Sequence, residues 1–275
     1  MLKKLFVYEW KDCWKVPTTI NVCLFIMTLI GVISLISPFW TLDYKIIDVF
    51  MFTALMIYYL SIIAGSIAVT VYIAVRYYKN IYTDEGYLTN TLPVTPRQIV
   101  LSKLFVSTIW NAITSIVITI SVFLLIHVAL VSYGDVNLFS ELGTLWTEIM
   151  MLCDSSEKLS LFALLFAIIL WLIVSPVFSN LMMYSSIALG QMFTKHKVAG
   201  AVFWYIIQYM ILQFVSALII NIPLFSGLLK AESNDFSPFA VINPIVYGSL
   251  LLTIAATVGQ YFISEYMLKR KLNLD

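Results

Sequence analysis

The sequence predicts an all-α integral membrane protein with six transmembrane helices. Six stretches of the chain contain no Asp, Glu, Lys or Arg, and 61% of the 275 residues are hydrophobic. Each stretch is longer than the about 20 apolar residues that a helix needs to cross the hydrocarbon core of a bilayer. The stretches are residues 16–42, 49–75, 104–134, 159–194, 198–229 and 236–264. We therefore expect one transmembrane domain over residues 1–275, surrounded by lipid.

The expected spans follow from these stretches and from the helix signals at their ends. They cover about residues 18–38, 48–82, 96–132, 159–188, 198–222 and 241–267. Ion-driven transporters usually carry ionisable side chains inside their membrane spans, where they bind and release the driving ion. The six apolar stretches contain no Asp, Glu, Lys or Arg, so ion-driven transport is disfavoured. An ion site built from backbone carbonyls at broken helices would escape this test.

Residues 1–16 are expected to form an interfacial amphipathic helix ahead of the first span. Its apolar face holds Leu2, Leu5, Phe6, Cys13 and Val16. Lysines and acidic residues take the opposite face, which is typical of a helix that lies along a membrane surface. Pro17 is expected to turn the chain into the bilayer. The alternative is a positively charged anchor with no other role.

The second span is predicted to continue past its charge-free stretch to Tyr82, because nothing breaks the helix before Asp84. From Asp48 this gives a helix of about 50 Å, which is expected to project into the cytoplasm. The third span begins at Thr95-Pro96-Arg97-Gln98. Threonine is a preferred N-cap, proline suits the first helical position, and glutamine can close a capping box.

Two further features concern the outer loop and the fourth span. Apolar residues recur at helical spacing in the loop 133–158, which predicts a short helix lying on the outer surface. Ser175-Pro176 predicts a kink in the fourth span. A nearby hydroxyl, from Ser175 or Ser179, or a neighbouring helix could satisfy the carbonyl that the proline frees.

The distribution of basic residues predicts the orientation. Thirteen of the sixteen lysines and arginines lie on one side of the membrane, and Lys45, Lys158 and Lys230 lie on the other. The positive-inside rule therefore places both termini in the cytoplasm. Cys13, Cys23 and Cys153 fall at different levels of this topology, so they are expected to be free thiols.

Several kinds of chemistry have no signal in the sequence. No G-x-x-x-x-G-K-S/T phosphate loop occurs, so the chain is not expected to hydrolyse ATP by that route. No H-E-x-x-H motif occurs, and His127 and His196 lie at opposite membrane faces, which disfavours a metal site. We expect His127 to be a hydrogen-bonded interface residue rather than a ligand. We expect no cofactor, no metal and no nucleic acid bound to this chain.

One face of the second span carries small and hydroxyl-bearing residues. Tyr58, Ser61 and Gly65 follow one another at spacings of three or four residues, as do Ala54, Ala68 and Tyr72 with them. Small residues on such a face let helices approach closely. Two interpretations remain open: ordinary packing within the chain, or a dimer seam or substrate pathway.

The segment between the second and third spans resembles a known family. Tyr82-Thr83-Asp84-Glu85-Gly86-Tyr87-Leu88 is followed by Thr91-Leu92-Pro93-Val94-Thr95 and then by Ile99 and Ser102-Lys103. This pattern resembles the cytoplasmic segment "E-G-x-L…L-P-V-S/T…I…x-K" of ABC-2-type (type V exporter-like) transporter permeases. The tail from Glu265 to Leu274 is similar to that of short bacterial members.

The resemblance implies a membrane-spanning permease subunit in the bacterial inner (cytoplasmic) membrane. Such a permease pairs with a second permease, here expected to be a second copy of the chain, and two ABC ATP-binding subunits bind ATP and Mg²⁺. The loop between the second and third spans then carries a coupling helix, and a shorter one follows the fourth span. The implied activity is export of amphipathic or hydrophobic cargo, such as peptides, by alternating access. The alternative is a secondary transporter or channel-type protein without an ATPase partner.

The resemblance also implies two sets of site residues. The ATPase-coupling residues are Tyr82, Asp84, Glu85, Gly86, Tyr87, Leu88, Gln191, Phe193 and Lys195. In this set, Tyr82, Tyr87 and Leu88 fill a groove on the partner, while Asp84 and Glu85 pair with its basic residues. The alternative for Asp84-Glu85 is a solvated turn. The candidate translocation pathway holds Tyr58, Ser61 and Gly65 of the second span with Gln208 and Gln213 of the fifth.

Overall fold

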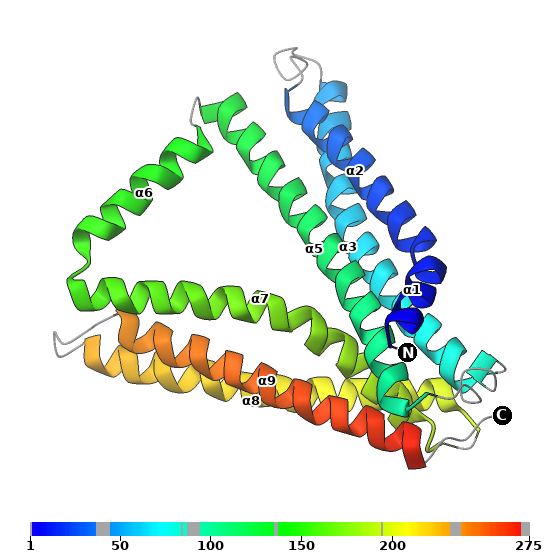
Figure 1. Cartoon of the computed structure of the whole chain (residues 1–275). Coiled ribbons are helices and arrows are strands. Elements are labelled where there is room, and N and C mark those ends of the chain that lie inside the picture. Colours follow the sequence, from blue (N-terminus) through cyan, green and yellow to red (C-terminus); the bar gives the residue numbers. More distant parts are fainter. Residues whose placement is uncertain are drawn as a thin grey trace. The chain divides into compact units, whose positions relative to one another are not determined.

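The computed structural model describes residues 2–36, 45–83, 85–86, 94–134, 137–193, 195–231 and 238–270. Every regular element within these ranges is a helix, and Figure 1 labels them. They are α1 (Leu2–Cys13), α2 (Lys15–Ile36), α3 (Lys45–Tyr82), α5 (Pro96–Gly134), α6 (Leu138–Leu152), α7 (Ser155–Gly190), α8 (Lys197–Ala231) and α9 (Pro238–Arg270).

Six of the described helices are long and apolar enough to cross a membrane, which confirms the predicted all-α fold class with six candidate spans. Their apolar bounds are Lys15–Ile36, Val49–Tyr82, Pro96–Ser132, Ser155–Gly190, Lys197–Leu229 and Pro238–Lys269. The expected end of the first span at residue 38 and the start of the interfacial helix at residue 1 lie outside the described residues.

The chain bends near its N-terminus at a different residue from the one expected. α1 ends at Cys13 and α2 begins at Lys15, so Trp14 separates the two helices. Pro17 lies in the first turn of α2, where a proline is tolerated because its missing N–H has no intrahelical acceptor. The expectation that Pro17 turns the chain is therefore replaced by a bend at Trp14.

Prolines inside the long helices do not end them. α7 continues through Pro176, and the Ser175 hydroxyl donates to the Leu172 carbonyl oxygen at 3.3 Å. That carbonyl is the one that Pro176 leaves without its usual i+4 donor, so Ser175 satisfies it as the sequence predicted. α8 likewise continues through Pro223 to Ala231, where an end at residue 222 was expected.

The helix signals around the second and third spans match the structure. α3 is one helix of 38 residues that ends at Tyr82. α5 begins at Pro96, and the Thr95 N–H donates to Gln98 Oε1 at 3.3 Å, which is the glutamine half of the predicted capping box. The short helix predicted for the loop 133–158 is present as α6, and within Leu138–Leu152 no residue is buried.

The chain folds as two compact units. Unit 1 comprises Met1–Phe6, Ala74–Thr108 and Cys153–Asp275, and unit 2 comprises Val7–Ile73 and Ile109–Leu152. The long helices α3 and α5 therefore contribute residues to both units.

In unit 2, hydroxyl groups join α2, α3 and α5. The Tyr58 hydroxyl lies 2.7 Å from Ser121 Oγ, and Thr28 Oγ1 lies 2.7 Å from the same oxygen. Leu24 packs on Gly65, where an added Cβ would meet the leucine Cδ2 at 2.7 Å. Close packing at a small residue and hydrogen bonds between helices both stabilise helix pairs where no water competes.

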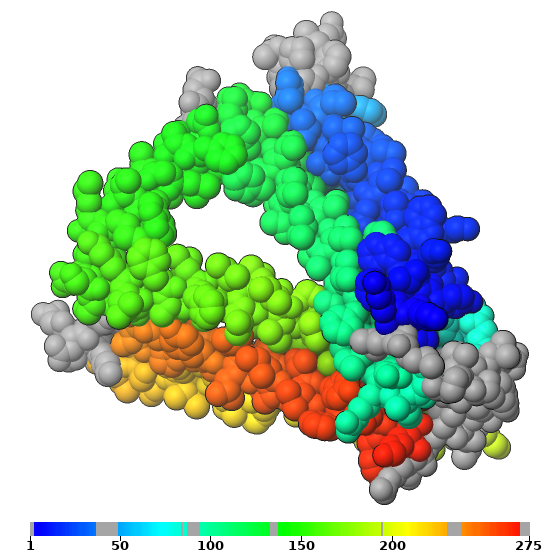
Figure 2. Space-filling model, viewed as in Figure 1, coloured from blue at the N-terminus to red at the C-terminus, as the bar shows by residue number. Residues whose placement is uncertain are grey.

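In unit 1, α7, α8 and α9 lie side by side, and Figure 1 shows the three helices together. Asn243 of α9 donates to Ser160 Oγ at 3.0 Å, and Trp171 Nε1 donates to Thr253 Oγ1 at 3.1 Å. From Ser160 to Trp171 along α7, the partner in α9 moves from Asn243 to Thr253, so α7 and α9 run in the same direction. In the space-filling view of Figure 2, side chains of α7 and α9 meet along the helices.

Candidate functional site

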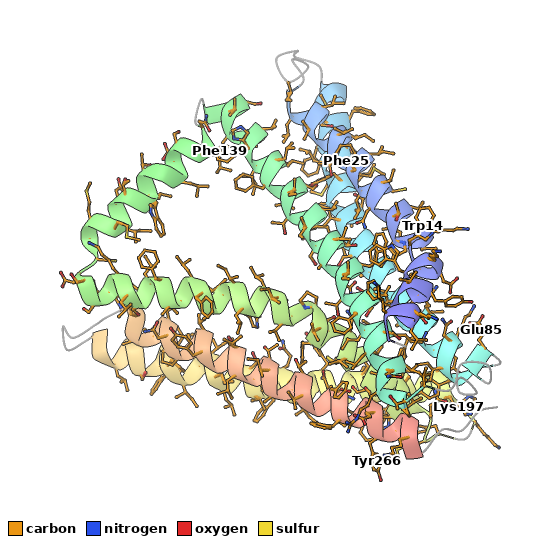
Figure 3. The ribbon with its side chains drawn as sticks, in the orientation of Figure 1. Trp14, Phe25, Glu85, Phe139, Lys197 and Tyr266 are labelled. Atoms are coloured by element: carbon orange, nitrogen blue, oxygen red, sulfur yellow. The ribbon has the colours of Figure 1, made fainter. Side chains whose placement is uncertain are left out.

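The segment that follows α3 is the candidate coupling site, and the structure describes part of it. Thr83 Oγ1 donates to the Lys79 carbonyl oxygen at 2.6 Å, and the Gly86 N–H donates to the Thr83 carbonyl oxygen at 2.7 Å. These bonds satisfy carbonyls at the helix end and fold the chain into a turn. Glu85 is exposed on this turn and is labelled in Figure 3.

The remaining predicted members of this segment have different placements. Asp84, Tyr87 and Leu88 lie outside the described residues. Tyr82 is only 2% exposed, and its ring packs edge to face on Tyr77 with 6.3 Å between the ring centroids. The Tyr82 ring therefore belongs to the core of unit 1 and is not a side chain open to a partner.

Asn80, on the last turn of α3, connects the exposed turn to α5. In the amide orientation that pairs donors with acceptors, the Asn80 nitrogen lies 2.7 Å from Glu85 Oε2 and 3.2 Å from the Arg76 carbonyl oxygen. The Asn80 amide oxygen lies 3.2 Å from Lys103 Nζ. Lys103 is 6% exposed. A buried ammonium is costly unless it is hydrogen-bonded, so the Asn80 oxygen contributes to keeping Lys103 in place.

Two stacked tyrosines connect α3 and α5 to α7. The rings of Tyr77 and Tyr184 are nearly parallel, with 3.7 Å between centroids and an interplanar angle of 8°, and each residue is 2% exposed. The Tyr184 hydroxyl donates to the Lys103 carbonyl oxygen at 3.4 Å. Tyr77 and Asn80 lie one turn apart on α3, so they share a face of that helix. Contacts among α3, α5 and α7 therefore form a closed set around Lys103.

Further polar contacts hold the same ends of α5, α7 and α9. Asn180, which is fully buried, donates from Nδ2 to Thr108 Oγ1 at 3.4 Å. Arg97, the second residue of α5, forms a salt bridge through Nε with Glu265 Oε1 near the end of α9. Arg97 is two-thirds exposed, so this ion pair contributes little to the stability of the fold.

The second predicted coupling segment lies between α7 and α8. Gln191 is 4% exposed and therefore belongs to the core, whereas Phe193 is 42% exposed and Lys195 is exposed. The Phe193 ring contacts Phe203 edge to face at 6.2 Å between centroids. The connection is tight because Gly190 packs directly on the backbone of Ala201. Phe193 and Lys195 are the two predicted residues of this segment that a partner could contact.

The candidate pathway residues of α3 contact other residues of the same chain. Tyr58 is 6% exposed and hydrogen-bonded to Ser121 of α5, and Gly65 is buried against Leu24 of α2. The half-buried Ser61 donates to the Tyr58 carbonyl oxygen at 2.7 Å. For this face of α3, these contacts favour the first of the two interpretations left open by the sequence.

The two candidate glutamines of α8 differ from one another. Gln208 Oε1 accepts a hydrogen bond from Ser185 Oγ of α7 at 3.0 Å, so Gln208 links two helices of unit 1. Gln213 is exposed on α8. Of the five predicted pathway residues, Gln213 alone has an exposed side chain.

Asn80, Lys103 and Tyr184 were not predicted as site residues. Lys103 belongs to the stretch that carries the resemblance but was given no role there; it is the eighth residue of α5 and is buried. A lysine at a helical position followed by a long apolar run is a signal for a buried polar contact, because a charged group at that place needs a partner. Tyr184 carries no such signal, since tyrosines are frequent at membrane interfaces for many reasons.

Among the residues that the structure describes, no group of three or more His, Cys, Asp or Glu side chains could hold a metal ion. No protein-family model, curated protein or solved structure matches the chain. The properties of the site therefore rest on its own residues and contacts.

Proposed function

We propose that this chain is the permease subunit of an ATP-binding-cassette exporter of the ABC-2 type. In this proposal two ATP-binding subunits dock on the turn after α3 and on the segment between α7 and α8. They bind ATP and Mg²⁺, which the permease itself does not bind. The assembled complex moves amphipathic or hydrophobic cargo, such as peptides, out of the cell. The segment from Tyr82 to Lys103 resembles the cytoplasmic segment of ABC-2-type permeases, which supports the choice of family. The six apolar helices support a multi-pass membrane protein.

The observation that carries the proposal is the length of α3 and what lies at its end. A helix of 38 residues is about 57 Å long, well beyond the about 30 Å of hydrocarbon that it has to cross. Its end carries an exposed carboxylate, Glu85, on a turn that Asn80 ties to α5. A partner that binds this turn therefore acts directly on a long, rigid helix.

The proposal places both termini in the cytoplasm of a bacterial cell, with the chain in the inner membrane. The thirteen basic residues on one side of the spans support this orientation. A second copy of the chain completes the transporter. Gln213, exposed on α8, is our remaining candidate for the pathway from the original set, because the other members have partners within the chain.

ATP hydrolysis should appear only when the chain is combined with an ATP-binding partner. The chain purified alone should show no turnover, because it has no phosphate loop. Hydrolysis and cargo transport should be measured in proteoliposomes with and without the partner, at constant ATP and with the proton gradient dissipated. Transport that follows the proton gradient and ignores ATP would support the secondary-transporter alternative and contradict the proposal.

Glu85→Lys should weaken the complex with the ATP-binding subunit. The change reverses a charge on the exposed turn, and a charge pair at an interface hot spot contributes about 2 kcal/mol. Recovery of the complex by affinity purification should fall about tenfold or more. Lys158→Ala is the matched control, because Lys158 lies near the opposite end of the chain's spans, at the start of α7. Equal recovery of both variants would remove the assignment of Glu85 to the docking surface.

A further inference from the structure

We infer that Asn80 is a positioning residue that ties the turn after α3 to α5 and α7. It does so through one clasp of five side chains: Tyr77, Asn80, Glu85, Lys103 and Tyr184. The inference rests on the proposed function and deepens it, because it names the contacts through which a movement of the turn would be transmitted to α5 and α7. The clasp itself is a property of the permease and can be tested without any partner.

The chemistry of the clasp depends on the amide of Asn80. An amide presents a donor at its nitrogen and an acceptor at its oxygen, so it can stand between an anion and a cation. Here the nitrogen lies 2.7 Å from the Glu85 carboxylate and the oxygen lies 3.2 Å from the Lys103 ammonium. Hydrogen bonds to ionised groups are stronger than those between neutral groups. Asn80 therefore links an exposed carboxylate to a buried ammonium, and neither aspartate nor leucine could serve both ends.

Lys103 contacts both Asn80 of α3 and Tyr184 of α7. Its side chain contacts Asn80, while its backbone carbonyl accepts the Tyr184 hydroxyl at 3.4 Å. Tyr184 in turn stacks on Tyr77, which lies on the same helix as Asn80. Because the set of contacts closes on itself, a displacement of the turn cannot move α3 alone without breaking at least one of them. Packed contacts of this kind move together as a rigid unit or change together between two arrangements.

The clasp also explains why an exposed glutamate matters inside the chain. Surface carboxylates usually contribute little to a fold. Glu85 is exposed, yet it accepts a hydrogen bond from a half-buried amide whose other end contacts a lysine that is 6% exposed. A partner that binds the Glu85 carboxylate competes with Asn80 for it and weakens the hydrogen bond between the two. Binding at Glu85 therefore changes the contacts of the buried Lys103 through Asn80.

The test measures amide hydrogen exchange of the turn in the full chain, in nanodiscs without a partner. The probe is the Gly86 N–H, which donates to the Thr83 carbonyl oxygen. Asn80→Leu should speed its exchange about tenfold, because it removes all three hydrogen bonds of the amide, those to Glu85 and Lys103 included. Glu85→Gln should speed it by a smaller factor, because the glutamine oxygen still accepts the hydrogen bond but carries no charge. The double variant should be no faster than Asn80→Leu, since both changes act on the same hydrogen bond.

The control is Asn221→Leu, which removes an amide of the same unit whose hydrogen bond, to the Ala217 carbonyl oxygen, stays within its own helix. This control should leave Gly86 exchange unchanged. Unchanged exchange in Asn80→Leu, or strictly additive effects in the double variant, would overturn the inference. If Asn80→Leu fails to fold, Glu85→Gln alone decides, because its side chain is exposed and its substitution leaves the core intact.

A second measurement separates the clasp from the proposed function. In a complex with an ATP-binding subunit, Asn80→Leu should keep hydrolysis but move several-fold less cargo per ATP. Equal cargo per ATP in the wild type and in Asn80→Leu would overturn the transmitting role of the clasp. If no ATP-binding subunit stimulates the chain, the proposed function fails, and the exchange experiment still decides the role of Asn80.

Discussion

Gly190→Ala should destabilise the protein by about 3 kcal/mol, although it adds only one methyl group. Gly190 is the last residue of α7, and an added Cβ would lie 2.5 Å from the Ala201 backbone nitrogen and 2.7 Å from its Cα. These atoms are backbone, so no side-chain rotation can relieve the overlap. α7 and α8 would have to separate where they now touch. The free energy of unfolding in detergent micelles measures the effect.

Two other glycines provide graded controls for this prediction. Gly259→Ala should be close to neutral, because nothing lies within 4 Å of the added Cβ. Gly200→Ala should fall between the two, since its nearest contact is Cδ2 of the Phe193 side chain, at 2.5 Å, which can move. A cost for Gly190→Ala no larger than that for Gly259→Ala would show that the backbones of α7 and α8 are not in direct contact.

The spans were predictable from the sequence because one physical requirement dominates them. A membrane-crossing helix needs a long apolar run, and the six charge-free stretches correspond to the six apolar helices of the structure. Local signals were equally readable. Gln98 caps α5 and Ser175 satisfies the carbonyl freed by Pro176, as residue types and spacing predicted.

The partners of individual side chains were not predictable in the same way. Tyr58 and Gly65 share a face of α3, but the sequence does not say whether that face meets another helix of the chain, a second copy or a pathway. The structure places Ser121 and Leu24 opposite them. A pattern along one helix fixes which residues share a face, whereas the contact depends on residues distant in the chain, such as Ser121.

The candidate coupling site shows the same division. Asp84 and Glu85 were assigned to the coupling site through the family resemblance of their segment, and Glu85 is exposed. Tyr82 was assigned to a partner's groove because aromatic residues are frequent interface anchors, yet its ring lies in the core of unit 1. Aromatic rings serve both purposes equally well, so residue type alone could not separate them.

Tyr184→Ala should lower the free energy of unfolding by about 3–5 kcal/mol, the usual cost of removing a buried aromatic ring. Tyr184 is 2% exposed and stacks on Tyr77 at 3.7 Å between centroids. Tyr184→Phe should cost only about 1 kcal/mol, because it keeps the stacked ring and removes one hydrogen bond, to the Lys103 carbonyl oxygen at 3.4 Å. The difference between the two variants separates the ring from the hydroxyl.

The same measurement on Tyr77 identifies the stack as the source of the effect. Tyr77→Ala should also be costly, and the double variant should cost less than the sum of the single ones, by about 0.5–1.5 kcal/mol, because the two rings lose one shared contact. Tyr209→Ala is the control, since Tyr209 lies in α8 of the same unit and is 49% exposed. Additive costs for the two rings, or an equal cost for Tyr209→Ala, would show that α3 and α7 are not joined by this stack, because independent sites add and an exposed ring leaves no cavity when it is removed.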